Sequence, residues 1–221
     1  MESFLYNHLY ESIKNISFQF ALQNSLFFQE PSMDYTLFDR TPEDILKSVF
    51  GYESFRPMQR KIIQNVLDGR DTLAVMPTGG GKSLCYEIPA LILPGITVVV
   101  SPLIALMQDQ VAQLESYGIS AVCLNSSLER NHYQKCCEKI LSGKIKLLYV
   151  SPEGLNSGRM IRLLQESKSS VDCIAIDEAH CISEWGARFS PGLHGNNSYK
   201  KSVSKIGFSC THSNCDKTSS S

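Results

Sequence analysis

The stretch from Met76 to Ser83 constrains this chain more than any other, and its sequence is Met-Pro-Thr-Gly-Gly-Gly-Lys-Ser. It follows an apolar run at 72–75 that predicts a buried strand, and it precedes residues 84–91, which predict the first turns of a helix. Such a turn can cradle a phosphate, because its backbone N–H groups face inward and the helix N-terminus adds partial positive charge. The expected phosphate-binding residues are Thr78, Gly79, Gly80, Gly81, Lys82 and Ser83. Lys82 would reach the β- and γ-phosphates of ATP, and the Ser83 hydroxyl would bind Mg²⁺.

A second part of a nucleotide site ends a later apolar run, where Asp177 and Glu178 follow residues 173–176. We expect Asp177 to hold Mg²⁺ through water, and Glu178 to orient and deprotonate the attacking water. Acidic pairs are common on surfaces, but a pair that ends a buried strand downstream of a phosphate loop is not. The predicted catalytic residues are therefore Lys82, Asp177 and Glu178.

Short apolar runs alternate with helical patterns along most of the chain. Strands are predicted at 72–75, 96–100, 121–124, 145–150 and 171–176, and helices at 103–117, 128–141 and 154–165. This alternation predicts an α/β fold with a parallel sheet, right-handed crossovers and helices on both faces. Together with the phosphate loop, it predicts a P-loop NTPase domain.

Composition limits the remaining possibilities. The 221 residues suffice for one sizeable domain, and 43% hydrophobic with 19% charged residues is typical of a globular protein. The net charge of −1 predicts no general attraction to nucleic acid, so any such binding needs a local groove. The eight cysteines lack paired C-x-x-C spacing, so no zinc is expected. With no secretory leader and no apolar run of ~18 residues, we expect an intracellular protein that does not bind membranes.

Two further sets of residues give weaker signals. Tyr52 could stack on a base and Gln59 could hydrogen-bond to an adenine edge, although a surface turn with a capping polar residue explains the same stretch. Ser101-Pro102 and Ser151-Pro152 each follow a predicted strand, where open α/β sheets bind ligands, although helix capping is an alternative.

Together these motifs resemble a known family. Residues 41–186 are similar to the first motor domain of RecQ-type ATP-dependent DNA helicases, in superfamily 2. The resemblance implies a RecA-like fold, adenine recognition by Tyr52, Arg56 and Gln59, and contact with DNA at Ser101 and Pro102. The sequence Asp-Glu-Ala-His at 177–180 is the family's helicase box, and Cys-Ile-Ser-Glu-Trp-Gly after it resembles the start of the RecQ aromatic-rich loop. That loop implies that Trp185 stacks on single-stranded DNA.

The resemblance ends after Gly186. The family continues His-Asp-Phe-Arg-Pro, whereas residues 187–191 read Ala-Arg-Phe-Ser-Pro and a polar tail follows. Codons that encode 187–191 can spell His-Asp-Phe-Arg-Pro when read one base later. Codons for 210–216 similarly spell Ala-Leu-Thr-Ala-Thr-Ala, the family's motif III. We therefore expect an N-terminal extension of unknown function at 1–40, an incomplete motor domain at 41–186, and a disordered, out-of-frame tail at 187–221.

The resemblance implies a 3′→5′ DNA helicase that hydrolyses Mg²⁺–ATP, binds single-stranded and branched DNA, and serves recombination and repair. A truncated, inactive fragment that at most binds nucleotide or nucleic acid is the alternative. An RNA helicase or remodelling ATPase fits Trp185 and Gln59 less well. The polar segment 209–214 in the place of the motif III strand further predicts an exposed apolar sheet edge and aggregation. The sequence leaves the oligomeric state open.

Overall fold

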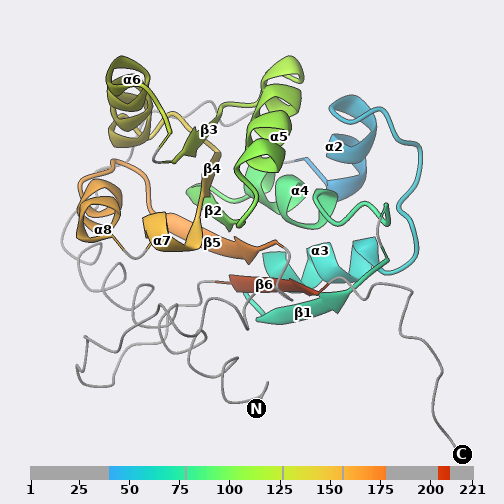
Figure 1. The fold of residues 1–221 in the computed structure, drawn as a ribbon. Helices are drawn as coiled ribbons and strands as arrows, with labels where there is room; N and C mark the ends of the chain where they lie inside the picture. The colour runs from blue at the N-terminus through green and yellow to red at the C-terminus, as the bar shows by residue number, and fades with distance from the viewer. Residues whose placement is uncertain (1–39, 78, 126, 156, 178–203, 210–221) are drawn as a thin grey trace, which may run out of the picture.

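The computed structural model of the chain describes residues 40–77, 79–125, 127–155, 157–177 and 204–209. Within them the centre is a six-stranded sheet in the order β1-β6-β5-β2-β4-β3, with every neighbouring pair parallel (Figure 1). The strands are β1 Thr72–Val75, β2 Ile96–Val100, β3 Ala121–Leu124, β4 Leu147–Val150, β5 Val171–Ile176 and β6 Ser204–Ser209. The α/β fold with a parallel sheet, predicted from the alternating pattern, is confirmed.

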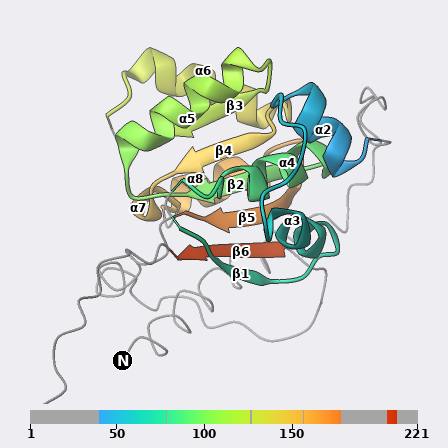
Figure 2. The same cartoon turned by 90° about the vertical axis from the view of Figure 1, so that its right-hand side faces the viewer.

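Helices cover both faces of this sheet (Figure 2). They are α2 Pro42–Ser48, α3 Gln59–Leu67, α4 Leu84–Ile92, α5 Ile104–Ser116, α6 Arg130–Leu141, α7 Pro152–Leu155 and α8 Gly158–Gln165. Residues of α2 to α5 share one hydrophobic core with the sheet, and residues of α6 to α8 share a second core. Strand β2 lies between them: Val99 packs in the first core, while Val98 and Val100 pack in the second. Successive side chains of a strand point to opposite faces, so a strand buried on both faces needs a continuous apolar run.

The start of the folded region follows from local chemistry. The Thr41 hydroxyl accepts from the Asp44 N–H at 3.2 Å, and the Asp44 carboxylate accepts from the Thr41 N–H at 3.0 Å. This reciprocal pair is a capping box, which satisfies backbone donors that the first helical turn leaves unpaired. Pro42 occupies the first turn, where its missing N–H costs nothing. The capping box therefore fixes the start of α2 directly after Thr41.

Several element boundaries differ from the sequence prediction: α5 is one residue shorter at each end than predicted, and α6 begins two residues later than predicted. The strand expected at 145–150 begins at Leu147, and the helix expected at 154–165 is two helices, α7 and α8. The second of these begins anew because the Ser157 hydroxyl accepts from the Met160 N–H at 3.2 Å. A serine cap of this kind starts a helix rather than continuing one.

The prediction of a wholly disordered tail is wrong for residues 204–209. They form β6, which pairs with β1 on one side and with β5 on the other. The expected gap at this place in the sheet is therefore filled, and filled by 204–209 rather than by the polar segment 209–214. A segment that lies between two strands can pair its backbone N–H and C=O groups with both of them. This pairing does not depend on the polarity of its side chains. The sequence of β6 also includes Ile206 and Phe208, residue types that favour strands.

Candidate nucleotide-binding site

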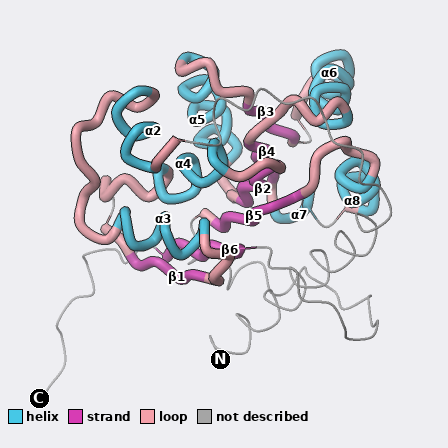
Figure 3. The backbone as a smooth tube through the Cα atoms, turned by 180° about the vertical axis from the view of Figure 1, so that it is seen from behind, coloured by secondary structure: helices cyan, strands magenta, loops and turns pink. Residues whose placement is uncertain are grey.

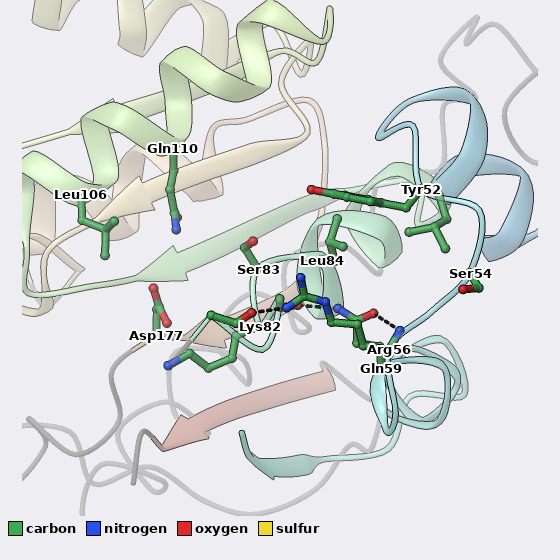
Figure 4. Close-up of a pocket in the computed structure, with 13 residues that line it drawn as sticks. Tyr52, Ser54, Arg56, Gln59, Lys82, Ser83, Leu84, Leu106, Gln110 and Asp177 are labelled. Atoms are coloured by element: carbon green, nitrogen blue, oxygen red, sulfur yellow. Dashed lines mark hydrogen bonds between the residues drawn. The ribbon is translucent and has the colours of Figure 1, made fainter. Parts of the chain in front are cut away.

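A pocket of ≈460 Å³ lies beyond the carboxyl end of β5, beside the start of α4 (Figure 4). Its lining comes from segments far apart in sequence: the loop before α3, the glycine turn, α5 and the end of β5. The lining residues are Leu46, Tyr52, Ser54, Arg56, Gln59, Gly79, Gly81, Lys82, Ser83, Leu84, Leu106, Gln110 and Asp177. Open α/β sheets bind ligands at such a place.

The glycine turn has the predicted strand-turn-helix geometry. It leaves β1 at Val75 and enters α4 at Leu84. Gly79 and Gly81 have φ of 75° and 74°, in the left-handed region where a residue with a Cβ is strained. The Gly80 N–H donates to the Pro77 carbonyl at 3.0 Å and closes the turn. Lys82 and Ser83 consequently reach the pocket directly before the helix.

Asp177 is placed by the central strands. It follows the last residue of β5, and its N–H donates to the Val100 carbonyl at the end of β2 at 2.9 Å. Its side chain is 5% exposed and lines the pocket together with Lys82 and Ser83. The structure thus brings together the two sequence motifs, about 95 residues apart, that were predicted to form one site. Glu178, Thr78 and Trp185 lie outside the described residues.

The loop that leads into α3 forms another wall of the pocket. Tyr52 is 52% exposed, whereas Gln59, the first residue of α3, is 1% exposed. Arg56 lies between them in the chain, and all three line the pocket. The predicted base-recognition residues therefore line the same pocket as the glycine turn. Their contact with a base stays a prediction.

Five lining residues were not predicted as site residues from the sequence: Leu46, Ser54, Leu84, Leu106 and Gln110. Leu106 and Gln110 both come from α5 and stand four residues apart, so they share one helix face. The Tyr86 hydroxyl of α4 donates to the Gln110 side-chain oxygen at 3.0 Å and fixes that side chain at the pocket. The i, i+4 spacing was visible in the sequence, but nothing local indicated that this face of α5 would meet the glycine turn.

A buried carboxyl also lies close to this site. Glu87, on α4, is 6% exposed, and burial raises the pKa of its carboxyl from near 4.5 to about 8. The negative charge of Asp177 adds to this rise in the pKa. Glu87 is therefore largely uncharged at neutral pH, which removes one like charge from the neighbourhood of Asp177.

The donor atoms fit a magnesium ion that is shared with a nucleotide. Within the described part of the chain, no group of three or more His, Cys, Asp or Glu residues is arranged to hold a metal by itself. Mg²⁺ commonly takes one or two protein oxygens and completes its shell with phosphate oxygens and water. The Ser83 hydroxyl and the Asp177 carboxylate supply such oxygens at one pocket.

Comparison with known proteins places this geometry in a family. The family model described as DEAD/DEAH box helicase matches residues 56–218, which is most of the chain. The chain belongs to the DEAD/DEAH box helicase family. Within this family the chain is similar to RecQ helicases. It is 54% identical over 151 residues to the ATP-dependent DNA helicase RecQ of Haemophilus influenzae. It is 47% identical over 150 residues to RecQ of Bacillus subtilis. The resemblance inferred from the motifs is confirmed.

These alignments cover the relatives unequally. They span 68% and 67% of this chain but only 24% and 25% of the two relatives. The chain thus corresponds to about a quarter of the length of these RecQ helicases. Among solved structures, the crystal structure of the DUF1998 helicase MrfA bound to DNA and AMPPNP is similar, with a TM-score of 0.59. At 20% identity over 85% of this chain, that likeness supports the helicase motor fold alone.

The segment after β2, predicted to contact DNA in this helicase family, has a mixed surface. Ser101 is 1% exposed, so its side chain is inside the protein, and Pro102 is partly exposed. The next two residues, Leu103 and Ile104, are 53% and 36% exposed. The DNA contact of Ser101 and Pro102 stays a prediction. In addition, none of the described helices has the length and apolar character required to cross a bilayer.

Proposed function

We propose that this chain binds Mg²⁺–ATP in the pocket between the glycine turn and the α3 loop, as the first motor domain of a RecQ-type DNA helicase. One observation carries the proposal: Lys82, Ser83 and Asp177 line the same pocket as the loop of Tyr52 to Gln59. The groups that we propose for phosphate, metal and base binding thus line one pocket. A glycine-rich loop that binds no nucleotide would not be expected to share a pocket with these other residues.

Each residue has a distinct role in the proposed site. The Lys82 ammonium binds the β- and γ-phosphates, and Ser83 with Asp177 holds Mg²⁺, which neutralises phosphate charge when bound. Tyr52, Arg56 and Gln59 line the part of the pocket proposed for the adenine base. By its place in the Asp-Glu-Ala-His box, Glu178 orients and deprotonates the attacking water.

The proposed substrate of the motor is DNA. Support comes from the similarity to proteins named as DNA helicases and from the Trp185 stretch, which resembles the RecQ aromatic-rich loop. Ser101, Pro102 and Trp185 are the proposed contacts to single-stranded DNA. Movement in the 3′→5′ direction, action on branched DNA and a role in recombination and repair are proposed on the same resemblance.

A second candidate function applies to the 221-residue chain by itself: nucleotide binding without unwinding. The observation that favours it is the coverage of only about a quarter of the RecQ relatives. In P-loop NTPases an arginine finger supplied by another domain or protein is worth about 10³–10⁵ in rate. The family resemblance implies that here it would come from the second motor domain. We therefore expect the isolated chain to bind Mg²⁺–ATP weakly and to separate no duplex DNA. ATP-dependent unwinding that is lost in Lys82→Ala would contradict this second candidate.

Calorimetric titration with Mg²⁺–ATP tests the site. The wild-type chain should bind one nucleotide, and Lys82→Ala should remove the binding, because it deletes the phosphate-binding charge. Lys144→Ala is the matched control, since Lys144 is exposed and does not line the pocket. Equal binding by the wild type and Lys82→Ala would show that the site is assigned to the wrong residues.

A further inference from the structure

Strand β1 is the outer strand of the described sheet, and the glycine turn follows it (Figure 1). It pairs with β6 along Thr72–Val75, and no described strand lies on its other side. The backbone N–H and C=O groups on that outer side therefore have no strand partner within the described residues. Such an edge is a template on which a further strand can pair.

The two faces of the sheet at β1 differ, and the difference defines which strand would fit there. On one face Ala74 is 5% exposed and belongs to the core shared with α3. On the other face Leu73 and Val75 are 55% and 56% exposed. Because side chains alternate along a strand, a neighbour of β1 would face the covered side and the open side in turn. It would need apolar and polar side chains in alternation.

The opposite edge of the described sheet calls for a different sequence. All four residues of β3 are buried, and they divide between the two cores on its two faces. A strand beside β3 would therefore need a continuous apolar run. An alternating strand fits the edge at β1 and not the edge at β3.

One stretch of the chain outside the described residues has this alternation. Residues 16–23 read Ile-Ser-Phe-Gln-Phe-Ala-Leu-Gln, with a large apolar residue at every second position. A period of two with isoleucine and phenylalanine is typical of a strand that is buried on one face. Asn15 precedes the stretch and Asn24-Ser25 follows it, and these residue types commonly bound strands.

The other long stretches outside the described residues fit this edge less well. Residues 210–221 contain no Val, Ile, Leu, Phe, Tyr or Trp. Residues 178–203 are interrupted by Gly186, Pro191, Gly192 and Gly195, and both residue types are depleted in strands.

The length of the chain also allows residues 16–22 to reach β1. About 18 residues separate Leu22 from Arg40, where the folded region begins. In extended form they span about 60 Å. A domain of ~150 residues is only about 40 Å across.

We propose that residues 16–22 of this chain add a seventh strand to the sheet, paired with the outer edge of β1. The apolar side chains of the new strand face the side covered by α3, and its polar side chains face the side on which Leu73 and Val75 are exposed. Strand β1 then has a partner on both edges, which holds the strand that leads into the glycine turn. This inference does not depend on the proposed nucleotide function.

Hydrogen exchange of the full-length chain, measured by mass spectrometry, tests the pairing. In the wild type, the amides of Thr72–Val75 should exchange slowly on both edges of β1. Phe18→Ser removes a side chain from the covered face, so the new strand should detach more often and exchange in β1 should become at least about tenfold faster. Gln19→Ser is the matched control, because position 19 faces the open side and exchange should stay unchanged. Equal exchange in Phe18→Ser and the wild type would overturn the proposal.

Photo-crosslinking identifies the neighbour of β1 even if Phe18→Ser does not fold. Leu73→p-benzoylphenylalanine places the reactive group at an exposed position, and light should join it to residues 15–23 of the same molecule. Lys135→p-benzoylphenylalanine, at an exposed position on α6, is the control and should not react with that segment. Mixing ¹⁵N-labelled with unlabelled chains separates products within one molecule from products between two. At position 73, a product with residues 178–203 or 210–221, a product between two copies, or no product would each overturn the proposal.

Discussion

The two edge strands of the sheet, β1 and β3, have opposite surroundings. Each has four residues, yet every residue of β3 is buried, whereas Leu73 and Val75 of β1 are 55% and 56% exposed. Strand β3 contacts α5 and α6, which belong to the two different cores. Strand β1 contacts α3, and its Ala74 is buried in the core on that face (Figure 3). The burial of an edge strand therefore depends on the helices that pack on its two faces, and not on its position at the edge of the sheet.

The difference matters because β1 leads directly into the glycine turn. Leu73 and Val75 point to the face opposite Ala74, since side chains alternate along a strand. No described residue of the second core comes from β1. The proposed nucleotide site is therefore built on the more thinly covered edge, and its position depends on α3 and α4. Exposed apolar strand residues of this kind favour aggregation.

A matched pair of leucine truncations should show the largest effect. Leu124 of β3 is 2% exposed, and Leu124→Ala should lower the free energy of unfolding by about 2–4 kcal/mol through lost burial and a cavity. Leu73→Ala on β1 should change it by only about 0.5 kcal/mol. Urea unfolding of both variants measures the difference. Similar losses at the two leucines would mean that the β1 face is covered.

The burial of Glu87 predicts how stability depends on pH. Its folded pKa of about 8 exceeds its ordinary value near 4.5, so the unfolded state releases this proton first as pH rises. Between these two pKa values the folded state binds more protons, and each pH unit upward should cost about 1.4 kcal/mol from this group. The contribution of Glu87 to stability is therefore greatest below its unfolded pKa near 4.5, and it is lost as pH rises toward 8.

Glu87→Gln should remove this dependence, because the amide keeps the neutral shape and cannot ionise. In denaturant unfolding, the free energy of unfolding of Glu87→Gln should rise steadily relative to that of the wild type from pH 5 to pH 8. Glu138→Gln, at an exposed position on α6, is the control and should follow the wild type. A constant difference between wild type and Glu87→Gln across this range would show that water reaches the α4 side of the sheet.

A smaller effect of backbone strain is expected near each edge. Met58, before α3, has φ of 73°, and Gly118, before β3, has φ of 75°. Met58→Gly should stabilise the chain by about 0.5–1 kcal/mol. The strain of a residue with a Cβ in the left-handed region exceeds the extra backbone entropy that glycine loses on folding. Gly118→Ala should destabilise by about 1 kcal/mol, because a Cβ there meets open space and only the backbone is strained. Thermal unfolding of the two variants should show opposite signs, and a lower melting temperature for Met58→Gly would contradict the assignment of strain.

The sequence predicts the central strands well because their signal is local. The apolar runs at β1, β2, β3 and β5 have the bounds of the strands themselves. Lys82, Ser83 and Asp177 were predictable for a related reason: each belongs to a motif whose chemistry requires that residue type. The meeting of the two motifs at one pocket then follows from the order of parallel strands.

The remaining features depend on contacts that no local pattern contains. Gln110 lines the site because α5 packs there, and Glu87 of α4 is buried close enough for the charge of Asp177 to raise its pKa. The engagement of Gln59 by the glycine turn is likewise a tertiary contact. Strand β6 was missed because a serine- and lysine-rich segment was read as disorder, while its pairing is made by the backbone. The frameshift after Gly186 stays a prediction. The nucleotide sequence tests it, because another frame should encode motif III and a second motor domain.

The most direct test of the central claim is the stability of the chain with and without Mg²⁺–ATP. A ligand that binds only the folded state stabilises it by about 2.7 kcal/mol at a concentration one hundred times its dissociation constant. The pocket is lined by the α3 loop, the glycine turn and the end of β5, so a bound nucleotide should raise the unfolding free energy of the wild type by this amount. Lys82→Ala should show no such rise. A wild type that Mg²⁺–ATP does not stabilise, or a Lys82→Ala variant stabilised equally, would contradict the nucleotide site.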